Sequence, residues 1–329
     1  MYQNATTPNI ELSVIIPSYK RCHLLKNLLK QIIEHASEKS SKPLPLFEVI
    51  VVDDGSPNLS EKETMLNELD FPFPFTFLKQ KNAGPASARN HGLKYAKGKF
   101  IAFLDDDAIP EKNWFYEIIQ GYEKNDNIAG ISGKNITLNP QTITEKFLDH
   151  IQHLNQHQYK EDGSVAYMCT VNCSFKKSVL DQVKGFDESF RYPAGEDMDI
   201  SFRVRKLGYI FQHNEDAIVF HKHRQSLFQL YKMFFLTGRG TYKCVAHNSD
   251  FDQSFTDEFS FKIVKVLRSL KNTLLDVIKT FVKNTLSSIK HRKLEFHPTL
   301  FLIMNMISLF FYQMGRFYEK IFGSKPSID

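Results

Sequence analysis

The sequence predicts an α/β protein with a mostly parallel central sheet, and two observations support this. Apolar runs of strand length, rich in β-branched residues, alternate with segments of helical periodicity over the first two thirds of the chain. Strands that are apolar on both faces are typical of parallel sheets covered by helices on both sides. Several of these runs also end directly in carboxylates. Ligands of such sheets bind beyond the carboxyl ends of the strands, so a polar site is expected there.

Composition narrows the class of protein. With 329 residues, of which 42% are apolar and 24% charged, the chain can form one large domain or two smaller ones. The net charge of +5 is modest, but basic residues concentrate in 262–293, which predicts a surface that meets anions. Cys169 and Cys173 lack a second ligand pair, so we expect reduced, buried thiols of a cytosolic protein rather than a zinc site. Residues 1–7 do not read as a secretory signal.

The first elements follow in a regular order. Apolar runs predict strands at 12–17, 47–52 and 76–80, and helical spacing of leucine and isoleucine predicts a helix at 23–33. Small residues open a further helix from 82 to about 96. Its free amides and Arg89 would form an anion-binding corner. The alternative is a Gly-Pro turn before a helix whose arginine is solvated.

The chain from 100 to 224 continues the alternation. We expect strands at 100–104, 128–132, 167–175 and 211–220, and helices at 114–123, 177–184 and 200–207. Pro110 is expected to stop the first of these strands. His150, His153 and His157 have helical spacing in a polar segment, but such histidines more often form a partly exposed stripe, so we do not predict them to be ligands.

Two groups of carboxylates stand at the expected edge of the sheet. Residues 105–107 are three aspartates that place a charge of about −3 at the end of a buried strand, which is costly without a cation. Such oxygens suit Mg²⁺ or Mn²⁺, normally shared with phosphate oxygens. A solvated acidic turn is the alternative. Glu196, Asp197 and Asp199 lie at the start of a predicted helix, where the helix dipole favours negative charge. Three acidic residues in four positions are more than helix capping requires.

Together these pieces resemble family 2 glycosyltransferases of the membrane-associated bacterial type. The matching segments are 13–19, 51–56, 88–90, 103–107, 185–188 and 195–199, within a region of about 11–225. Each is weak alone, but their order and spacing are specific. The resemblance implies inverting enzymes with the GT-A nucleotide-diphospho-sugar transferase fold.

The resemblance also implies roles for single residues on the donor side. Pro17, Tyr19 and Asp54 would lie against the nucleoside, with Asp54 accepting from the base. Arg89 would approach the nucleotide, and Asp105 would lie near the ribose.

The same resemblance implies which residues bind the metal and which take part in catalysis. Asp107 and His221 would bind Mg²⁺ or Mn²⁺, and Asp106 takes the variable middle position outside the site. Asp197 matches the catalytic base and Glu196 its neighbour in the acceptor pocket. The helix N-terminus is expected to lower the pKa of Asp197 and keep it ionised.

The implied activity is transfer of a sugar from a nucleotide-diphospho-sugar to a hydroxyl of a glycan or lipid-linked acceptor, in cell-surface polysaccharide or lipopolysaccharide synthesis. The alternatives are a nucleotidyltransferase or a non-catalytic sugar-nucleotide-binding scaffold of the same fold. A nucleic-acid partner is not expected, because the acidic strand ends would repel phosphate.

Residues 226–329 are expected to form a helical, basic and apolar region after a catalytic domain of 1–225. The basic segment 262–293 has an amphipathic pattern that suits a lipid interface, packing on its own domain, or a homo-oligomer. The run 300–311 is the most apolar but falls short of the ~20 residues that span a bilayer. We therefore expect a cytoplasmic protein held peripherally on the inner, anionic face of the cell membrane.

Overall fold

The computed structural model describes residues 10–38, 42–155, 164–248 and 298–323. The chain divides into two compact units, one ending at Ser226 and one beginning at Leu227. The basic segment 262–293, His157 and residues 1–7, about which the sequence made predictions, lie outside the described residues.

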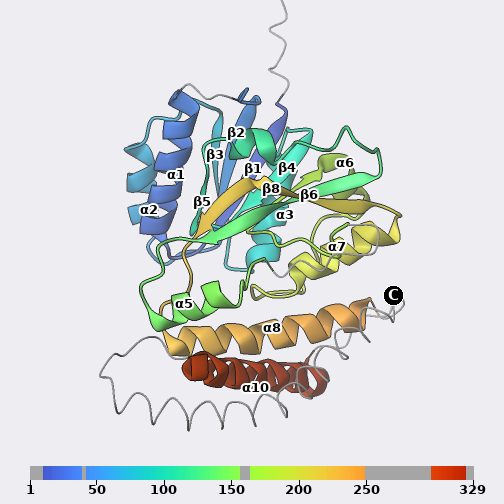
Figure 1. The fold of residues 1–329 in the computed structure, drawn as a ribbon. Coiled ribbons are helices and arrows are strands. Elements are labelled where there is room, and N and C mark those ends of the chain that lie inside the picture. The colour runs from blue at the N-terminus through green and yellow to red at the C-terminus, as the bar shows by residue number, and fades with distance from the viewer. Residues whose placement is uncertain (1–9, 39–41, 156–163, 249–297, 324–329) are drawn as a thin grey trace, which may run out of the picture. The chain divides into compact units, whose positions relative to one another are not determined.

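The first half of the N-terminal unit is a parallel α/β arrangement (Figure 1). Its strands lie in the order β3-β2-β1-β4. They are β1 (Leu12–Ser18), β2 (Phe47–Asp53), β3 (Phe75–Lys79) and β4 (Phe100–Leu104), and the helices are α1 (Cys22–Ser37), α2 (Leu59–Asn67) and α3 (Pro85–Tyr95). The strands and helices predicted for this half are confirmed to within a few residues at each end.

The second half extends the sheet to eight strands, with β7, β6, β8 and β5 following β4. Its strands are β5 (Ala108–Pro110), β6 (Ile128–Thr137), β7 (Asn172–Lys176) and β8 (Ile210–His221), and its helices are α4 (Trp114–Glu117), α5 (Ile143–His150), α6 (Lys177–Gln182) and α7 (Glu196–Lys206). Strand β7 runs antiparallel to both β4 and β6, and β5 runs antiparallel to β8. The sheet is therefore mixed, with parallel pairing in the remaining neighbours.

Several predicted boundaries differ from the structure. The strand expected at 167–175 begins only at Asn172, the strand expected at 128–132 continues to Thr137, and the helix expected at 177–184 ends at Gln182. Pro110 does not end the strand that begins at Phe100, because β4 already ends at Leu104. Pro110 is instead the last residue of β5, an edge strand, where a residue without an N–H group is tolerated. The helix expected at 114–123 ends at Glu117 and gives way to turns. The helix expected from 200 begins at Glu196, directly after Gly195, whose left-handed φ of 90° sets the entry into the helix.

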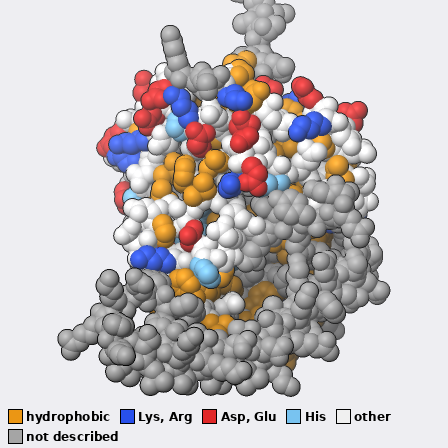
Figure 2. Space-filling view, in the orientation of Figure 1, with side chains coloured by type: hydrophobic (Ala, Val, Ile, Leu, Met, Phe, Trp, Pro, Cys, Tyr) orange, Lys and Arg blue, Asp and Glu red, His pale blue; other side chains and the backbone are white. Residues whose placement is uncertain are grey.

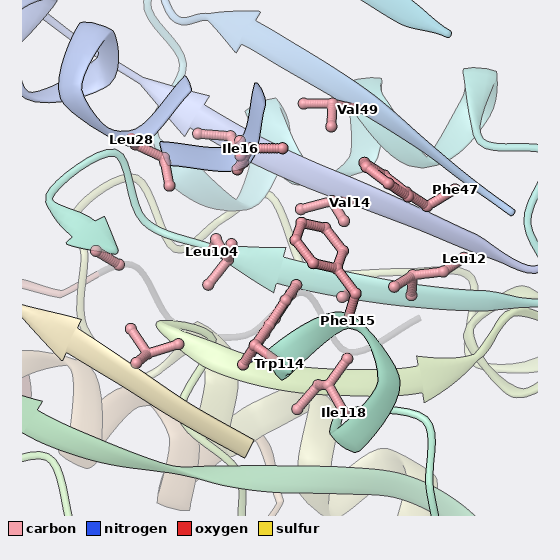
Figure 3. Close-up of a cluster of buried hydrophobic side chains, with 14 of the residues drawn as sticks. Leu12, Val14, Ile16, Leu28, Phe47, Val49, Leu104, Trp114, Phe115 and Ile118 are labelled. Carbon is pink, nitrogen blue, oxygen red and sulfur yellow. The ribbon is translucent and has the colours of Figure 1, made fainter. Parts of the chain in front are cut away.

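Strand side chains alternate between two apolar layers. Leu12 and Val14 of β1 point to the face covered by α1, α2 and α4. Ile15 points to the face covered by α3, α6 and α7. Figure 3 shows part of the first layer, in which Trp114 and Phe115 pack against the strands. Burial of both sheet faces explains why the strands read as continuous apolar runs.

A buried ion pair joins α2 to the carboxyl end of β2. Lys62 and Asp53 are each 1% exposed, and their Nζ and Oδ1 atoms are 2.5 Å apart. The same ammonium donates to the hydroxyls of Ser18 and Ser56. Although burial opposes it, the hydrogen bonds that Asp53 accepts from Lys62 and Ser56, together with the Lys62 charge, lower the pKa of Asp53.

In the C-terminal unit, the described residues form α8 (Leu227–His247) and α10 (Pro298–Phe322). A Cβ at Gly238 would clash with the carbonyl oxygen of Tyr312, and one at Gly315 with that of Phe235. The two backbones therefore approach as closely as glycine allows.

Helix α10 is longer than the apolar run that the sequence analysis singled out. The helix does not end after 311 but continues through Phe322, and this added part includes Arg316, Glu319 and Lys320. By length and composition, Leu300–Phe322 is one helix among the described residues that could cross a membrane, although 22% of its most apolar window is buried.

We expect Lys62→Met to lower the free energy of unfolding by about 3–5 kcal/mol, because it leaves Asp53 as an uncompensated buried charge. The matched control is Lys79→Met, which breaks the exposed Lys79–Glu63 pair and should cost less than about 1 kcal/mol. Urea unfolding followed by Trp114 fluorescence measures both.

The difference between the parent and Lys62→Met should also depend on pH. Because the pKa of Asp53 in the folded protein lies below its ordinary value of 3.8, the pair stabilises fully above that pH and the contribution disappears on further acidification. Equal losses for Lys62→Met and Lys79→Met would contradict this account.

Candidate active site

The three aspartates form the turn between β4 and β5. Strand β4 ends at Leu104, the turn contains Asp105, Asp106 and Asp107, and the amide of Ala108 donates to the carbonyl of Asp105 at 3.1 Å. The register of β5 on β8 places Ala108 opposite His221. The short strand β5 therefore holds the acidic turn against the end of β8.

Asp105, Asp107 and His221 form a candidate metal centre. Each offers one ligand atom, and these atoms all lie within 4.8 Å of one another. Nε2 of His221 lies 3.1 Å from Oδ1 of Asp107, and both side chains are almost fully buried, whereas Asp105 is 31% exposed. Two carboxylates and an imidazole fit a divalent cation that prefers oxygen ligands and accepts nitrogen. Although burial opposes it, the charges of His221 and Arg21 lower the pKa of Asp107, so its carboxylate is ionised.

Arg21 also belongs to this site, and the sequence did not indicate its role. Its guanidinium pairs with Asp107 through NH1 and with Asp106 through NH2, the latter at 2.5 Å. Asp106 is fully buried, and burial raises its pKa to about 7 despite the Arg21 charge. Two features of the sequence could have indicated Arg21. Three adjacent carboxylates need a cation nearby, and Arg21 lies in the loop after β1, the strand that pairs with β4.

Arg89 connects the acidic turn to the start of α7. It is 3% exposed and donates to Oδ1 of Asp105 at 3.0 Å and to Oε1 of Glu196 at 2.9 Å. These two carboxylates, rather than open solvent, face its guanidinium. The predicted contact of Arg89 with a nucleotide stays a prediction.

Glu196 and Asp197 lie in the first turn of α7, after Gly195. Oδ1 of Asp197 accepts from the amide of Met198 at 2.8 Å. Burial raises the pKa of Glu196 to about 7 and raises that of Asp197 as well. The expectation that the helix N-terminus lowers the pKa of Asp197 is therefore wrong, because desolvation outweighs the helix dipole here.

The residues predicted to contact the nucleoside lie at the ends of β1 and β2. Pro17 is within β1, and Tyr19 follows it with 39% of its surface exposed. Asp54 accepts from two backbone amides, at Ala83 and Gly84, and from the side-chain amides of Gln80 and Asn82. These four donors fill the acceptor capacity of the carboxylate and organise the loop before α3. A contact between Asp54 and a nucleobase stays a prediction that requires one of them to be displaced.

A polar cavity of about 120 Å³ adjoins His221. It is lined by the end of β6, by α5 and the loop after it, and by His153 and His223. Burial lowers the pKa of His153 to about 4. The helical spacing of His153 did not predict this position, because several other residues that line the cavity come from distant parts of the chain.

A family model described as "Glycosyl transferase family 2" matches residues 13–184, which is more than half of the chain. The chain belongs to this family. Cys22, Cys169, Cys173 and Cys244 form no disulfide bond.

The curated relatives of this glycosyltransferase include longer proteins. The chondroitin synthase of Pasteurella multocida (strain Pm70) is 27% identical over 248 residues, covering 65% of this chain and 25% of that protein. The pre-mycofactocin glycosyltransferase of Mycobacterium tuberculosis (strain ATCC 25618 / H37Rv) is 30% identical over 191 residues, covering 54% of this chain and 38% of that protein. The chain thus matches about a quarter of the length of the first.

Solved structures establish the fold. Mannosyltransferase PcManGT from Pyrobaculum calidifontis in complex with GDP-Man and Mn²⁺ has a TM-score of 0.64 at 14% identity, covering 95% of this chain and 87% of that one. GalNAc-T7 with UDP, GalNAc and Mn²⁺ has a TM-score of 0.53 at 14% identity, covering 72% and 48%. The predicted GT-A fold is confirmed.

We expect Asp107→Asn to abolish the Mn²⁺-dependent part of nucleoside diphosphate binding, because the neutral amide replaces the buried ionised ligand. Calorimetry with UDP and GDP, with and without Mn²⁺, measures it. The control is Asp181→Asn, an exposed aspartate of α6. Unchanged Mn²⁺-dependent affinity in a folded Asp107→Asn protein would refute the metal assignment.

Proposed function

We propose that this glycosyltransferase transfers a sugar, with inversion, from a nucleotide-diphospho-sugar to a hydroxyl of a glycan or lipid-linked acceptor. The observation that carries the proposal is one connected site. The cluster of Asp105, Asp107 and His221 is joined through Arg89 to the carboxylates that open α7. The site thus holds both a centre for a cation with diphosphate and a separate acid pair for proton transfer.

The donor side of the proposal rests on the metal cluster. Asp107 and His221, with Asp105 beside them, would hold Mg²⁺ or Mn²⁺. When bound, a divalent cation would neutralise charge that develops on a leaving diphosphate. The solved GT-A neighbours support this choice, since they are complexes of Mn²⁺ with GDP-Man or with UDP and GalNAc. Pro17, Tyr19 and Asp54 would lie on the nucleoside side.

The acceptor side requires a base. An acceptor hydroxyl is a weak nucleophile near neutral pH, and a carboxylate within hydrogen-bond reach can take its proton as the new bond forms. Asp197 is our candidate, with Glu196 beside it in the acceptor pocket, because Glu196 is engaged by Arg89. A pKa raised by burial brings a carboxylate closer to the operating pH, which suits a general base. Attack opposite the leaving group inverts the anomeric carbon without a covalent intermediate.

The proposed pathway class is cell-surface polysaccharide or lipopolysaccharide synthesis. It is supported by the names of relatives such as the chondroitin and hyaluronan synthases of Pasteurella multocida. Because the chain matches only part of their length, their substrates come to this protein as a proposal.

We expect Asp197→Asn to retain binding of UDP, GDP and Mn²⁺ but to lose transfer by ~10²–10⁴-fold, the range for a removed general base. The matched control is Asp199→Asn in the same helical turn, whose carboxylate pairs with Arg203 at 2.8 Å. Single-turnover transfer from the donor found by screening sugar nucleotides measures both. Transfer at the parent rate by Asp197→Asn, together with a loss in Glu196→Gln, would show that the two roles are exchanged.

We propose that the C-terminal region, 226–329, holds the enzyme peripherally on the cytoplasmic face of the membrane, with a homo-oligomer as the alternative. Helix α10 carries an exposed apolar stripe at spacings of three and four residues: Leu300, Ile303, Ile307, Phe310, Met314, Phe317 and Ile321. On the face of the catalytic unit shown in Figure 2, acidic and basic side chains are interspersed. A contiguous exposed apolar stripe of this kind supports an interaction role.

We expect Phe310→Ser with Phe317→Ser to reduce co-sedimentation with phosphatidylglycerol vesicles, because these rings are 61% and 65% exposed on the apolar stripe. The control is Asn305→Ser with Gln313→Ser, which changes polar positions of the same helix. Equal sedimentation of both proteins, with a change of oligomeric state in the phenylalanine variant alone, would favour the homo-oligomer.

A further inference from the structure

We infer that Arg21 is a positioning residue for the metal ligand Asp107, and that the buried Asp106 is its anchor. This inference rests on the metal site proposed above. The middle aspartate of the acidic turn, which the resemblance left outside the site, thereby acquires a structural task in metal binding.

The two oxygens of Asp107 face different partners. Oδ2 pairs with the guanidinium of Arg21, while Oδ1 lies 3.1 Å from Nε2 of His221. Adjacent ligands of an octahedral ion at 2.0–2.1 Å are separated by about 3 Å, so the spacing of Oδ1 and Nε2 matches a pair of neighbouring ligands. Arg21 holds the oxygen that the ion does not need and so fixes the direction of the other one.

The guanidinium can do this because it is anchored at its second nitrogen. NH2 of Arg21 lies 2.5 Å from Oδ1 of Asp106, whose side chain is fully buried beneath the turn. A planar fork that spans two carboxylates fixes the rotation of both, which a single ammonium cannot do.

The backbone of Arg21 is also held in place. The amide of Lys20 donates to the hydroxyl of Ser56 at 2.9 Å, and Lys20 has a left-handed φ of 66°. Arg21 follows immediately, at the position that caps α1. The loop after β1 therefore places the guanidinium of Arg21 beside the acidic turn that follows β4, because β1 and β4 are neighbours in the sheet.

Removing Arg21 should have opposite effects on metal affinity depending on whether Arg21 acts through its charge or by orienting Asp107. By Coulomb's law alone, loss of a positive charge beside Asp107 should tighten the binding of a cation. Loss of an outer partner that orients a ligand typically weakens metal binding by about 10–100-fold. The sign of the change in metal affinity therefore separates positioning from simple charge.

The test is titration of the full-length protein with Mn²⁺, followed by electron paramagnetic resonance of the free ion, alone and with UDP or GDP. We expect Arg21→Gln to raise the Kd for Mn²⁺ by about 10–100-fold. The matched control is Lys20→Gln, which removes one charge from the same loop without a contact to the aspartates and should leave the Kd unchanged or slightly lower. An unchanged or lower Kd in Arg21→Gln would overturn the inference.

Two further variants keep the inference falsifiable if Arg21→Gln does not fold. Arg21→Lys retains the charge but cannot bridge both carboxylates, so it should also weaken Mn²⁺ binding, and parent-like affinity would overturn the fork. Asp106→Asn should weaken Mn²⁺ binding as well, and its effect should not add to that of Arg21→Gln, since both break one unit. Absence of Mn²⁺ binding by the parent would instead overturn the metal site itself.

Discussion

Compensation of carboxylate charge at one edge of the sheet is the constraint on which this site depends. Arg89 is buried between Asp105 and Glu196, and these carboxylates raise its pKa although burial opposes them. Removing one partner of such a group leaves a buried charge uncompensated, at a cost of about 3–5 kcal/mol. The acidic turn, α3 and the start of α7 are therefore energetically coupled, and the proposed metal and acid-base regions are joined by a single guanidinium.

The buried carboxylic acids at this edge differ in their pKa values. Desolvation raises the pKa of Glu196 to about 7, whereas the cationic neighbours of Asp107 lower its pKa in spite of burial. An acid whose pKa is raised in the folded state reduces stability at any pH above its unfolded value, so Glu196 costs stability at neutral pH. Carboxyl groups with pKa values pushed apart are typical of sites that assign different roles to similar side chains.

The sequence predicted the strands and helices whose own apolar pattern is clear, and missed those that exist only through contacts with distant segments. The strands β1, β2 and β4 were visible because both of their faces are buried, and Asp107, His221 and Asp197 were placed through the resemblance. Strand β5 was not predicted, because three residues that end in a proline carry no periodic signal and exist only through pairing with β8. The tasks of Arg21 and Arg89 depend on which carboxylates the fold brings to them, and no spacing along the chain encodes that.

Strand direction explains why distant segments meet. Strand β7 is antiparallel to β4 and to β6, so β6 regains the direction of β4, and β8 pairs parallel with β6. The carboxyl ends of β1, β2, β4 and β8 therefore lie at one edge, which brings Asp107 and His221 together across most of the catalytic unit. Helix α7 precedes β8 and returns the chain to the opposite edge, so its N-terminus, with Glu196 and Asp197, starts at the edge where the candidate metal ligands lie. A single antiparallel strand between two parallel sets thus preserves the polarity that assembles the site.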